Sequence, residues 1–151
     1  MLTKGYAQGP EVVPEGAFTF PVDASSEPRE LGFLLLDRFT LLAFSAALDP
    51  LRVANQLAQK SLYRWTLFSE TGNPVTASSG IDVSVHGKLD DLSPDLRLLV
   101  CSGNQWLEAA SDATVSKIRK HVRFGGRTGG ICTGAATLAR AGLLEGLIPT
   151  A

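Results

Sequence analysis

This sequence of 151 residues has little cysteine, little net charge and no long apolar run. Two cysteines, Cys101 and Cys132, are too few for a disulfide framework, which favours a reducing cytoplasm. A formal net charge of −1 gives no electrostatic reason for this segment alone to bind nucleic acid. No apolar stretch approaches the roughly 20 residues that span a bilayer, and the N-terminus lacks the apolar segment of a secretory signal. We therefore predict a cytoplasmic protein without membrane contact.

The sequence does contain enough apolar material for one folded domain. Hydrophobic residues make up 44% of the chain and charged residues 19%, as in globular proteins. Four of the eight prolines fall within residues 1–29, which we expect to form an irregular N-terminal arm with a possible strand at Ala17–Phe20. Residues 30–151 are expected to form the domain itself.

Apolar strands and amphipathic helices alternate along the rest of the chain. Strands are expected at 31–36, 63–69, 96–101 and 127–132, with short strands around Gly80 within 75–85. Helices are expected at 40–59, 115–124 and 135–144, the first of them kinked or divided by Pro50. This alternation predicts an α/β fold with a mostly parallel sheet and helices on both faces.

The pentapeptide Gly130-Ile131-Cys132-Thr133-Gly134 stands between the last predicted strand and the last predicted helix. It fits a nucleophile elbow, a sharp strand-to-helix turn that lifts one side chain above the end of a sheet. Glycines on both sides suit the crowded backbone of such a turn. A cysteine at a helix N-terminus also feels the positive end of the helix dipole, which favours the thiolate. Cys132 is therefore predicted to be reactive or to face a ligand.

Three segments of the chain should meet at the carboxyl ends of the strands, where ligands bind in open α/β sheets. They are Phe39-Thr40 after the first strand, Ser102–Trp106 after the third, and Cys132-Thr133 at the elbow. Together they offer thiol, hydroxyl, amide and aromatic groups. The candidate ligand-binding residues are Cys132, Thr133, Thr40, Phe39, Gly103, Asn104, Gln105 and Trp106.

Six blocks of residues occur in an order that carries a family resemblance. They are Asp49–Asn55, Tyr63–Trp65, Gly72–Val75, Ala77–Ile81, Gly130–Gly134 and Leu138–Leu144. Together they resemble the PfpI-like, class I glutamine amidotransferase-like superfamily, and within it the N-terminal sensor domain of AraC-type transcriptional regulators. The resemblance implies a flavodoxin-like three-layer sandwich, a small-molecule effector, a homodimer, and DNA binding through a separate C-terminal helix-turn-helix domain. It implies no cofactor and no metal.

Enzymes of that superfamily pair the cysteine with a titratable partner, and this sequence departs from them at each such position. The residue after the cysteine is a histidine in the hydrolase and chaperone-like branches but Thr133 here, and their glutamate position is Thr40. The aspartate of the branch that resembles isocyanide hydratases corresponds to Ala43. His86 and His121 are expected to be solvated, in a polar hairpin and on an outer helix. The resemblance therefore implies binding without catalysis, because general acid–base chemistry needs such a partner.

The leading hypothesis is a ligand-sensing and dimerising domain that binds an amino-acid- or betaine-like metabolite. The alternative is a PfpI-like cysteine enzyme, a hydrolase or an isocyanide-hydratase-like enzyme, acting through Cys132. A third hypothesis is an oligomerising module with an empty crevice. The superfamily continues past Leu143-Leu144 with further strands, so a chain that stops at Ala151 is expected to be an incomplete domain without its DNA-binding part.

Two further features have ordinary structural interpretations. Cys101 ends an apolar strand and is expected to be a small core residue. Basic residues gather on and after the helix predicted at 115–124, and we expect them to form a solvated surface. These residues are Lys117, Arg119, Lys120, Arg123 and Arg127.

Overall fold

The computed structural model describes residues 19–20 and 27–146. Most of the expected N-terminal arm lies outside the described residues, and so does the first half of the possible strand at Ala17–Phe20. Thr19 and Phe20 are not in a strand. The Phe20 amide donates a hydrogen bond to the Leu57 carbonyl at 2.9 Å, so this short described segment contacts the first helix.

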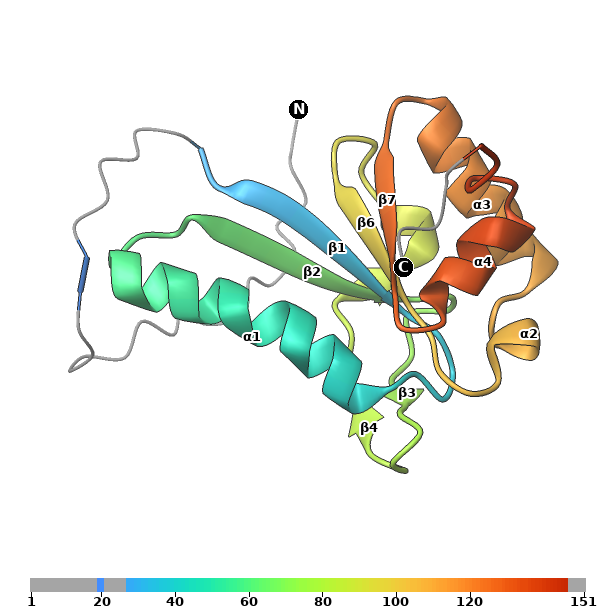
Figure 1. Cartoon of the computed structure of the whole chain (residues 1–151), viewed down its shortest axis with the longest axis horizontal. Helices are drawn as coiled ribbons and strands as arrows, with labels where there is room; N and C mark the ends of the chain where they lie inside the picture. Colours follow the sequence, from blue (N-terminus) through green and yellow to red (C-terminus); the bar gives the residue numbers. More distant parts are fainter. Residues whose placement is uncertain (1–18, 21–26, 147–151) are drawn as a thin grey trace.

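A five-stranded parallel sheet forms the middle layer, in the order β5-β2-β1-β6-β7 (Figure 1). Its strands are β1 (Arg29–Leu35), β2 (Tyr63–Ser69), β5 (Gly87–Lys88), β6 (Arg97–Cys101) and β7 (Arg127–Ile131). A separate antiparallel pair consists of β3 (Val75–Thr76) and β4 (Asp82–Val83). The helices are α1 (Leu41–Ala58), α2 (Trp106–Ala109), α3 (Asp112–Arg123) and α4 (Gly134–Arg140), with a 3-10 turn η1 at Leu89–Asp91.

Strand β1 lies at the centre of the sheet because its apolar residues are buried on both faces. Phe33 is in register with Leu67 of β2 on one side and Leu99 of β6 on the other. Its side chain packs in the core that α1 covers, whereas Leu34 packs in the core beneath α2, α3 and α4. Figure 1 shows α1 on one side of the sheet and the other three helices on the opposite side. The predicted α/β fold, with helices on both faces of a parallel sheet, is confirmed.

Helix α1 runs without interruption through Pro50, so the expected division into two helices is wrong. A proline inside a helix removes one hydrogen bond to the carbonyl four residues earlier, here that of Ala46. Both Pro50 and Ala46 are exposed to solvent. The carbonyl that loses its donor is thus on the side of the helix that water can reach, and the buried side of α1 keeps its packing.

Helix α3 begins at Asp112, three residues before the expected start. Ser111 caps it, because its side-chain oxygen accepts a hydrogen bond from the Thr114 amide at 3.1 Å. The expectation that both histidines are solvated is wrong for His121, which is 8% exposed and whose Nε2 lies 3.0 Å from the Leu96 carbonyl oxygen. His86 is exposed, and its Nδ1 accepts a hydrogen bond from the Leu67 amide at 2.9 Å.

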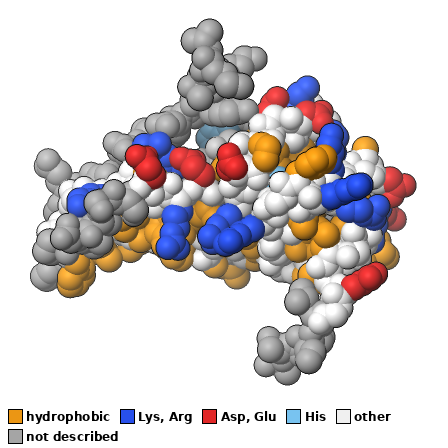
Figure 2. All heavy atoms as spheres, turned by 90° about the horizontal axis from the view of Figure 1, so that it is seen from above, with side chains coloured by type: hydrophobic (Ala, Val, Ile, Leu, Met, Phe, Trp, Pro, Cys, Tyr) orange, Lys and Arg blue, Asp and Glu red, His pale blue; other side chains and the backbone are white. Residues whose placement is uncertain are grey.

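Basic and acidic side chains are interspersed on the face shown in Figure 2. Of the basic residues expected to be solvated, Lys117 is paired with Asp90, its Nζ 2.6 Å from Oδ1. Arg119 donates from Nε to the Ala141 carbonyl at 3.0 Å, which ties α3 to the end of α4. Part of the basic surface therefore holds the fold together. In the described part of the chain, no helix has the length and apolarity to cross a bilayer.

Candidate functional site

Cys132 occupies a strained turn between β7 and α4. Its φ of +55° lies in the left-handed region, which residues with a Cβ seldom adopt. The two glycines of the pentapeptide are required by close backbone approach. A Cβ on Gly130 would overlap the Ala135 amide, and a Cβ on Gly134 would overlap the Val100 carbonyl oxygen. The predicted nucleophile elbow is confirmed, with the cysteine exposed at its tip.

Hydrogen bonds join the three segments that were expected to meet at this edge of the sheet. The Thr40 amide donates to the Ser102 carbonyl at 3.2 Å, and Thr133 Oγ1 donates to the Gly103 carbonyl at 2.6 Å. Thr40 Oγ1 lies 3.6 Å from Cys132 Sγ. These contacts connect the ends of β1, β6 and β7 directly, so the predicted convergence is confirmed.

The four remaining candidate residues differ in whether a ligand could reach their side chains. Asn104 and Gln105 are exposed and Trp106 is half-buried, and their side chains make no hydrogen bond to any other described residue. Phe39 differs, because its ring is 0% exposed and packs edge-to-face against Phe44 with ring centroids 5.7 Å apart. In this conformation Phe39 supports the site from the core and offers no surface to a ligand.

One buried hydroxyl at the site was not among the candidates. Ser102 is 1% exposed, and its Oγ has no hydrogen-bond partner among the described residues. Leaving a buried polar group unpaired costs about 1–3 kcal/mol, so such groups often mark functional positions. The sequence signal was the position of Ser102 directly after β6, at the carboxyl ends of the strands, where ligands bind in open α/β sheets.

The pKa values of the two cysteine thiols are shifted in opposite directions. The Thr40 hydroxyl, together with the Thr133 amide, lowers the pKa of the Cys132 thiol, against an opposing effect of burial that is smaller than that of Thr40. Burial raises the pKa of the Cys101 thiol to about 12. Cys101 is 1% exposed, which confirms the predicted core position, and a buried thiol of this kind is unreactive. Of the two thiols, that of Cys132 is the more acidic and the more accessible.

Thr40→Val is expected to slow the alkylation of Cys132 at pH 7 about two- to fivefold, because the thiolate loses its hydroxyl partner. The pKa of Cys132 is held below its ordinary value, so removing this cause raises it and leaves less thiolate at neutral pH. The rate of iodoacetamide alkylation against pH should shift to higher pH, whereas Thr40→Ser should keep the native profile. An unchanged profile in Thr40→Val would show that the hydroxyl has no effect on the sulfur.

Within the described residues, no histidine or carboxylate forms a hydrogen bond with the Cys132 sulfur. The side-chain partner of Cys132 Sγ is the Thr40 hydroxyl, which as a neutral alcohol is too weak a base to take up a proton at neutral pH. His86 bonds to the backbone of β2, and His121 bonds to Leu96 at the amino-terminal end of β6. Cys132 instead follows the carboxyl-terminal end of β7. Residues 19–20 and 27–146 also contain no cluster of His, Cys, Asp and Glu suited to a metal ion.

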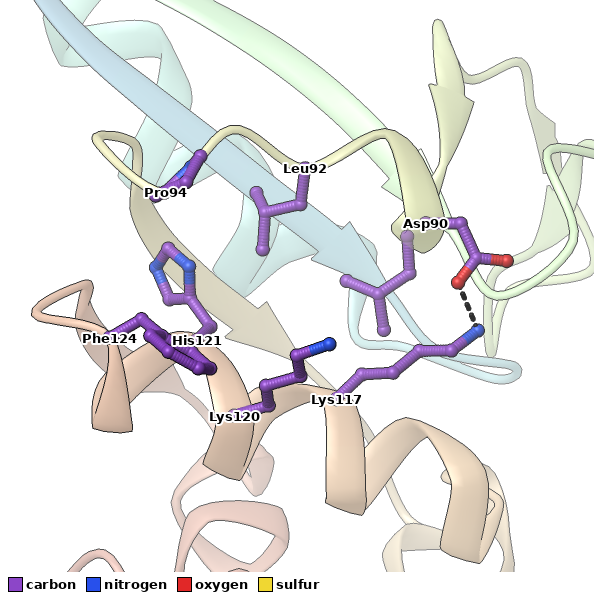
Figure 3. Close-up of a pocket in the computed structure, with 8 residues that line it drawn as sticks. Asp90, Leu92, Pro94, Lys117, Lys120, His121 and Phe124 are labelled. Carbon is purple, nitrogen blue, oxygen red and sulfur yellow. Dashed lines mark ion pairs between the residues drawn. The ribbon is translucent and has the colours of Figure 1, made fainter.

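A cavity of about 230 Å³ lies at a different place, between the η1 loop and α3 (Figure 3). Leu92 and Pro94 line one side, and Lys120 and Phe124 line the other. None of the predicted ligand-binding residues contributes to it. The candidate site at Cys132 is therefore an exposed surface site formed by three segments, separate from this cavity.

Comparisons with known proteins agree with this geometry. No family model matches the sequence. The chain is 40% identical over 119 residues to the HTH-type transcriptional regulator GbdR of Pseudomonas aeruginosa, covering 79% of the chain and 32% of the relative. It is 43% identical over 118 residues to the HTH-type regulator CdhR of the same species, covering 78% of the chain and 35% of the relative.

A solved AraC family regulator from Pseudomonas putida is 28% identical with a TM-score of 0.67, over 78% of this chain and 63% of that one. The chain is therefore similar in sequence to HTH-type regulators, including the AraC family, and has a ThiJ/PfpI-like α/β fold. A ThiJ/PfpI family protein from Pseudomonas syringae, 16% identical with a TM-score of 0.64, shares the fold of this PfpI-like domain over 85% of the chain and 55% of its own length. The chain spans about a third of the length of the curated regulators it matches.

Proposed function

We propose that this PfpI-like domain senses a small metabolite beside Cys132 and forms a homodimer in a cytoplasmic regulator. The observation that carries the proposal is the bond between Thr40 and the elbow sulfur, in a chain whose relatives are transcriptional regulators. A hydroxyl in this position can orient a ligand but cannot shuttle protons at neutral pH. In this proposal the elbow keeps its shape for recognition, and no acid–base partner bonds its sulfur within the described residues.

The ligand class follows from the groups that the site offers. The Thr40 hydroxyl and the free amides of Asn104 and Gln105 supply uncharged hydrogen-bonding groups for a carboxylate or hydroxyl. The ring of Trp106 can hold a cationic or quaternary ammonium group by a cation–π contact of about 0.5–2 kcal/mol. An amino-acid- or betaine-like zwitterion combines both requirements. Thr133 and Gly103 take part in the site through the backbone, since the Thr133 hydroxyl is already bonded to the Gly103 carbonyl.

Sensing requires that the ligand prefer one of two arrangements of the regulator. In this proposal the ligand favours one dimer arrangement, and a C-terminal helix-turn-helix domain outside this chain converts that arrangement into DNA binding. Residues 30–151 act as the sensor domain and need no cofactor. The affinity difference between the two arrangements sets the largest response that the ligand can produce.

A thermal-shift screen with proteinogenic amino acids and glycine betaine tests this proposal. A true ligand at one hundred times its Kd should stabilise the domain by about 2.7 kcal/mol. The matched compound 3,3-dimethylbutanoate keeps the carboxylate and shape of glycine betaine but lacks its positive charge, so it should stabilise less. Trp106→Leu should abolish the difference, and Trp65→Phe should retain it. No stabilisation by any compound would contradict the sensor and favour a module that only oligomerises.

A cysteine enzyme remains the second candidate, because the left-handed Cys132 and its lowered pKa also suit a nucleophile. Turnover of an amide, aldehyde or isocyanide substrate that disappears in Cys132→Ser would establish it. Under the sensor proposal these substrates are not turned over, while Cys132 still reacts with iodoacetamide.

A further inference from the structure

Arg140, the last residue of α4, bridges two elements that lie beyond its own helix. Its Nη1 donates to the Leu107 carbonyl at 3.1 Å and to the Ala110 carbonyl at 2.9 Å. Its Nη2 donates to Asp112 Oδ1 at 2.8 Å. A single guanidinium therefore holds the end of α2 and the start of α3 against the helix that follows the elbow.

The same elbow and helix also hold the other end of α2. Thr133 Oγ1 donates to the Gly103 carbonyl at 2.6 Å, three residues before α2 begins. Residues 103–110, here called the bridging segment, are thus attached at both ends to residues 133–140. Between the two attachments stand Asn104, Gln105 and Trp106, the free side chains of the proposed ligand site.

The bridging segment cannot hold this shape by its own secondary structure. Helix α2 has four residues, and so short a helix is unstable in isolation because nucleation is costly. No side chain caps its first turn. The position of the bridging segment must therefore come from tertiary contacts. The Arg140 guanidinium makes two of these contacts, by donating to the Leu107 and Ala110 carbonyls.

We propose that Arg140 is a positioning residue, which fixes Asn104–Trp106 beside Cys132 and couples the elbow to α2 and α3. The proposal rests on the proposed function only in taking these residues as the ligand site. The two carbonyl bonds carry the effect, because the Asp112 side chain is fully exposed and such ion pairs contribute little. The planar guanidinium presents several fixed donors at once, which a lysine ammonium cannot place on both carbonyls.

The test uses the fluorescence of Trp106 without any ligand. The chain has two tryptophans, so Trp65→Phe leaves Trp106 as the single reporter. In that background, Arg140→Ala should raise the acrylamide quenching constant of Trp106 about twofold at a temperature where the protein stays folded. Arg140→Lys should remain close to Arg140→Ala, and Asp112→Asn should keep the native value.

Arg119→Ala is the matched control for a merely structural effect. Arg119 also bonds a backbone carbonyl at the end of α4, that of Ala141, but it does not touch the bridging segment. It should lower the melting temperature without changing Trp106 quenching. Equal quenching in Arg119→Ala and Arg140→Ala, or no increase in Arg140→Ala, would overturn the proposal.

Hydrogen exchange gives a second measurement in the chain with both tryptophans, and it decides the question if Trp65→Phe fails to fold. Amides of residues 103–110 should exchange faster in Arg140→Ala and at the native rate in Arg119→Ala. Native exchange in Arg140→Ala would also overturn the proposal. Both measurements are made without ligand, so a failed ligand screen contradicts the sensor function and leaves the positioning role standing.

Discussion

Gly134→Ala should lower the free energy of unfolding by more than about 3 kcal/mol, at the upper end of the range for overpacked sites. The added Cβ would overlap the Val100 carbonyl oxygen and stand 2.8 Å from the Val100 carbonyl carbon. Both atoms belong to the backbone of β6, which pairs with β1 and β7 and cannot move aside. Urea denaturation followed by circular dichroism measures the loss.

Gly129→Ala is the control, because Gly129 lies in β7, the strand that leads into the elbow. A Cβ there meets only Leu99 Cδ2, at 3.1 Å, and a leucine side chain can shift by that small amount. We expect Gly129→Ala to cost less than about 1.5 kcal/mol, in line with tolerated apolar changes. Equal costs for the two variants would mean that contact with the β6 backbone is not what requires glycine at position 134.

The elbow could be predicted from sequence because its determinants are local. Gly130 and Gly134 flank the cysteine at fixed spacing, and the backbone contacts that require them are made within the turn or by the neighbouring strand. The continuous apolar runs of β1 and β6 likewise predicted strands that are buried on both faces of the sheet. The strand predicted at 63–69 agrees in both bounds with β2, since alternating polar and apolar residues mark its length.

The features that sequence could not provide depend on contacts between distant residues. His121 faces the core because Leu96, 25 residues earlier, presents a carbonyl to its ring. Arg140 falls in the middle of the helix predicted at 135–144, and its role follows only from the carbonyls of residues about 30 positions earlier in the chain. Periodicity gives the face of a helix, but it does not say which backbone groups the neighbouring elements present to that face.

Phe39→Ala should lower the free energy of unfolding by about 3–5 kcal/mol, the usual cost of removing a buried phenylalanine ring. The ring is fully buried and makes an edge-to-face contact with Phe44 at an interplanar angle of 89°. Phe44 makes a similar contact with Phe33 at 5.6 Å, so the loss would spread through the core that α1 covers. Chemical denaturation of the purified variant measures the change.

Phe39→Leu separates a core role from a role in ligand binding. Leucine keeps most of the buried apolar volume, so this variant should cost less than Phe39→Ala while the backbone that presents Thr40 stays in place. If Phe39 only supports the site, the variant keeps the native Cys132 alkylation rate and the native ligand response in the thermal-shift screen. A lost ligand response at near-native stability would instead place the ring in the ligand site. That result would require the site to open in solution, because a fully buried ring has no surface that a ligand can contact.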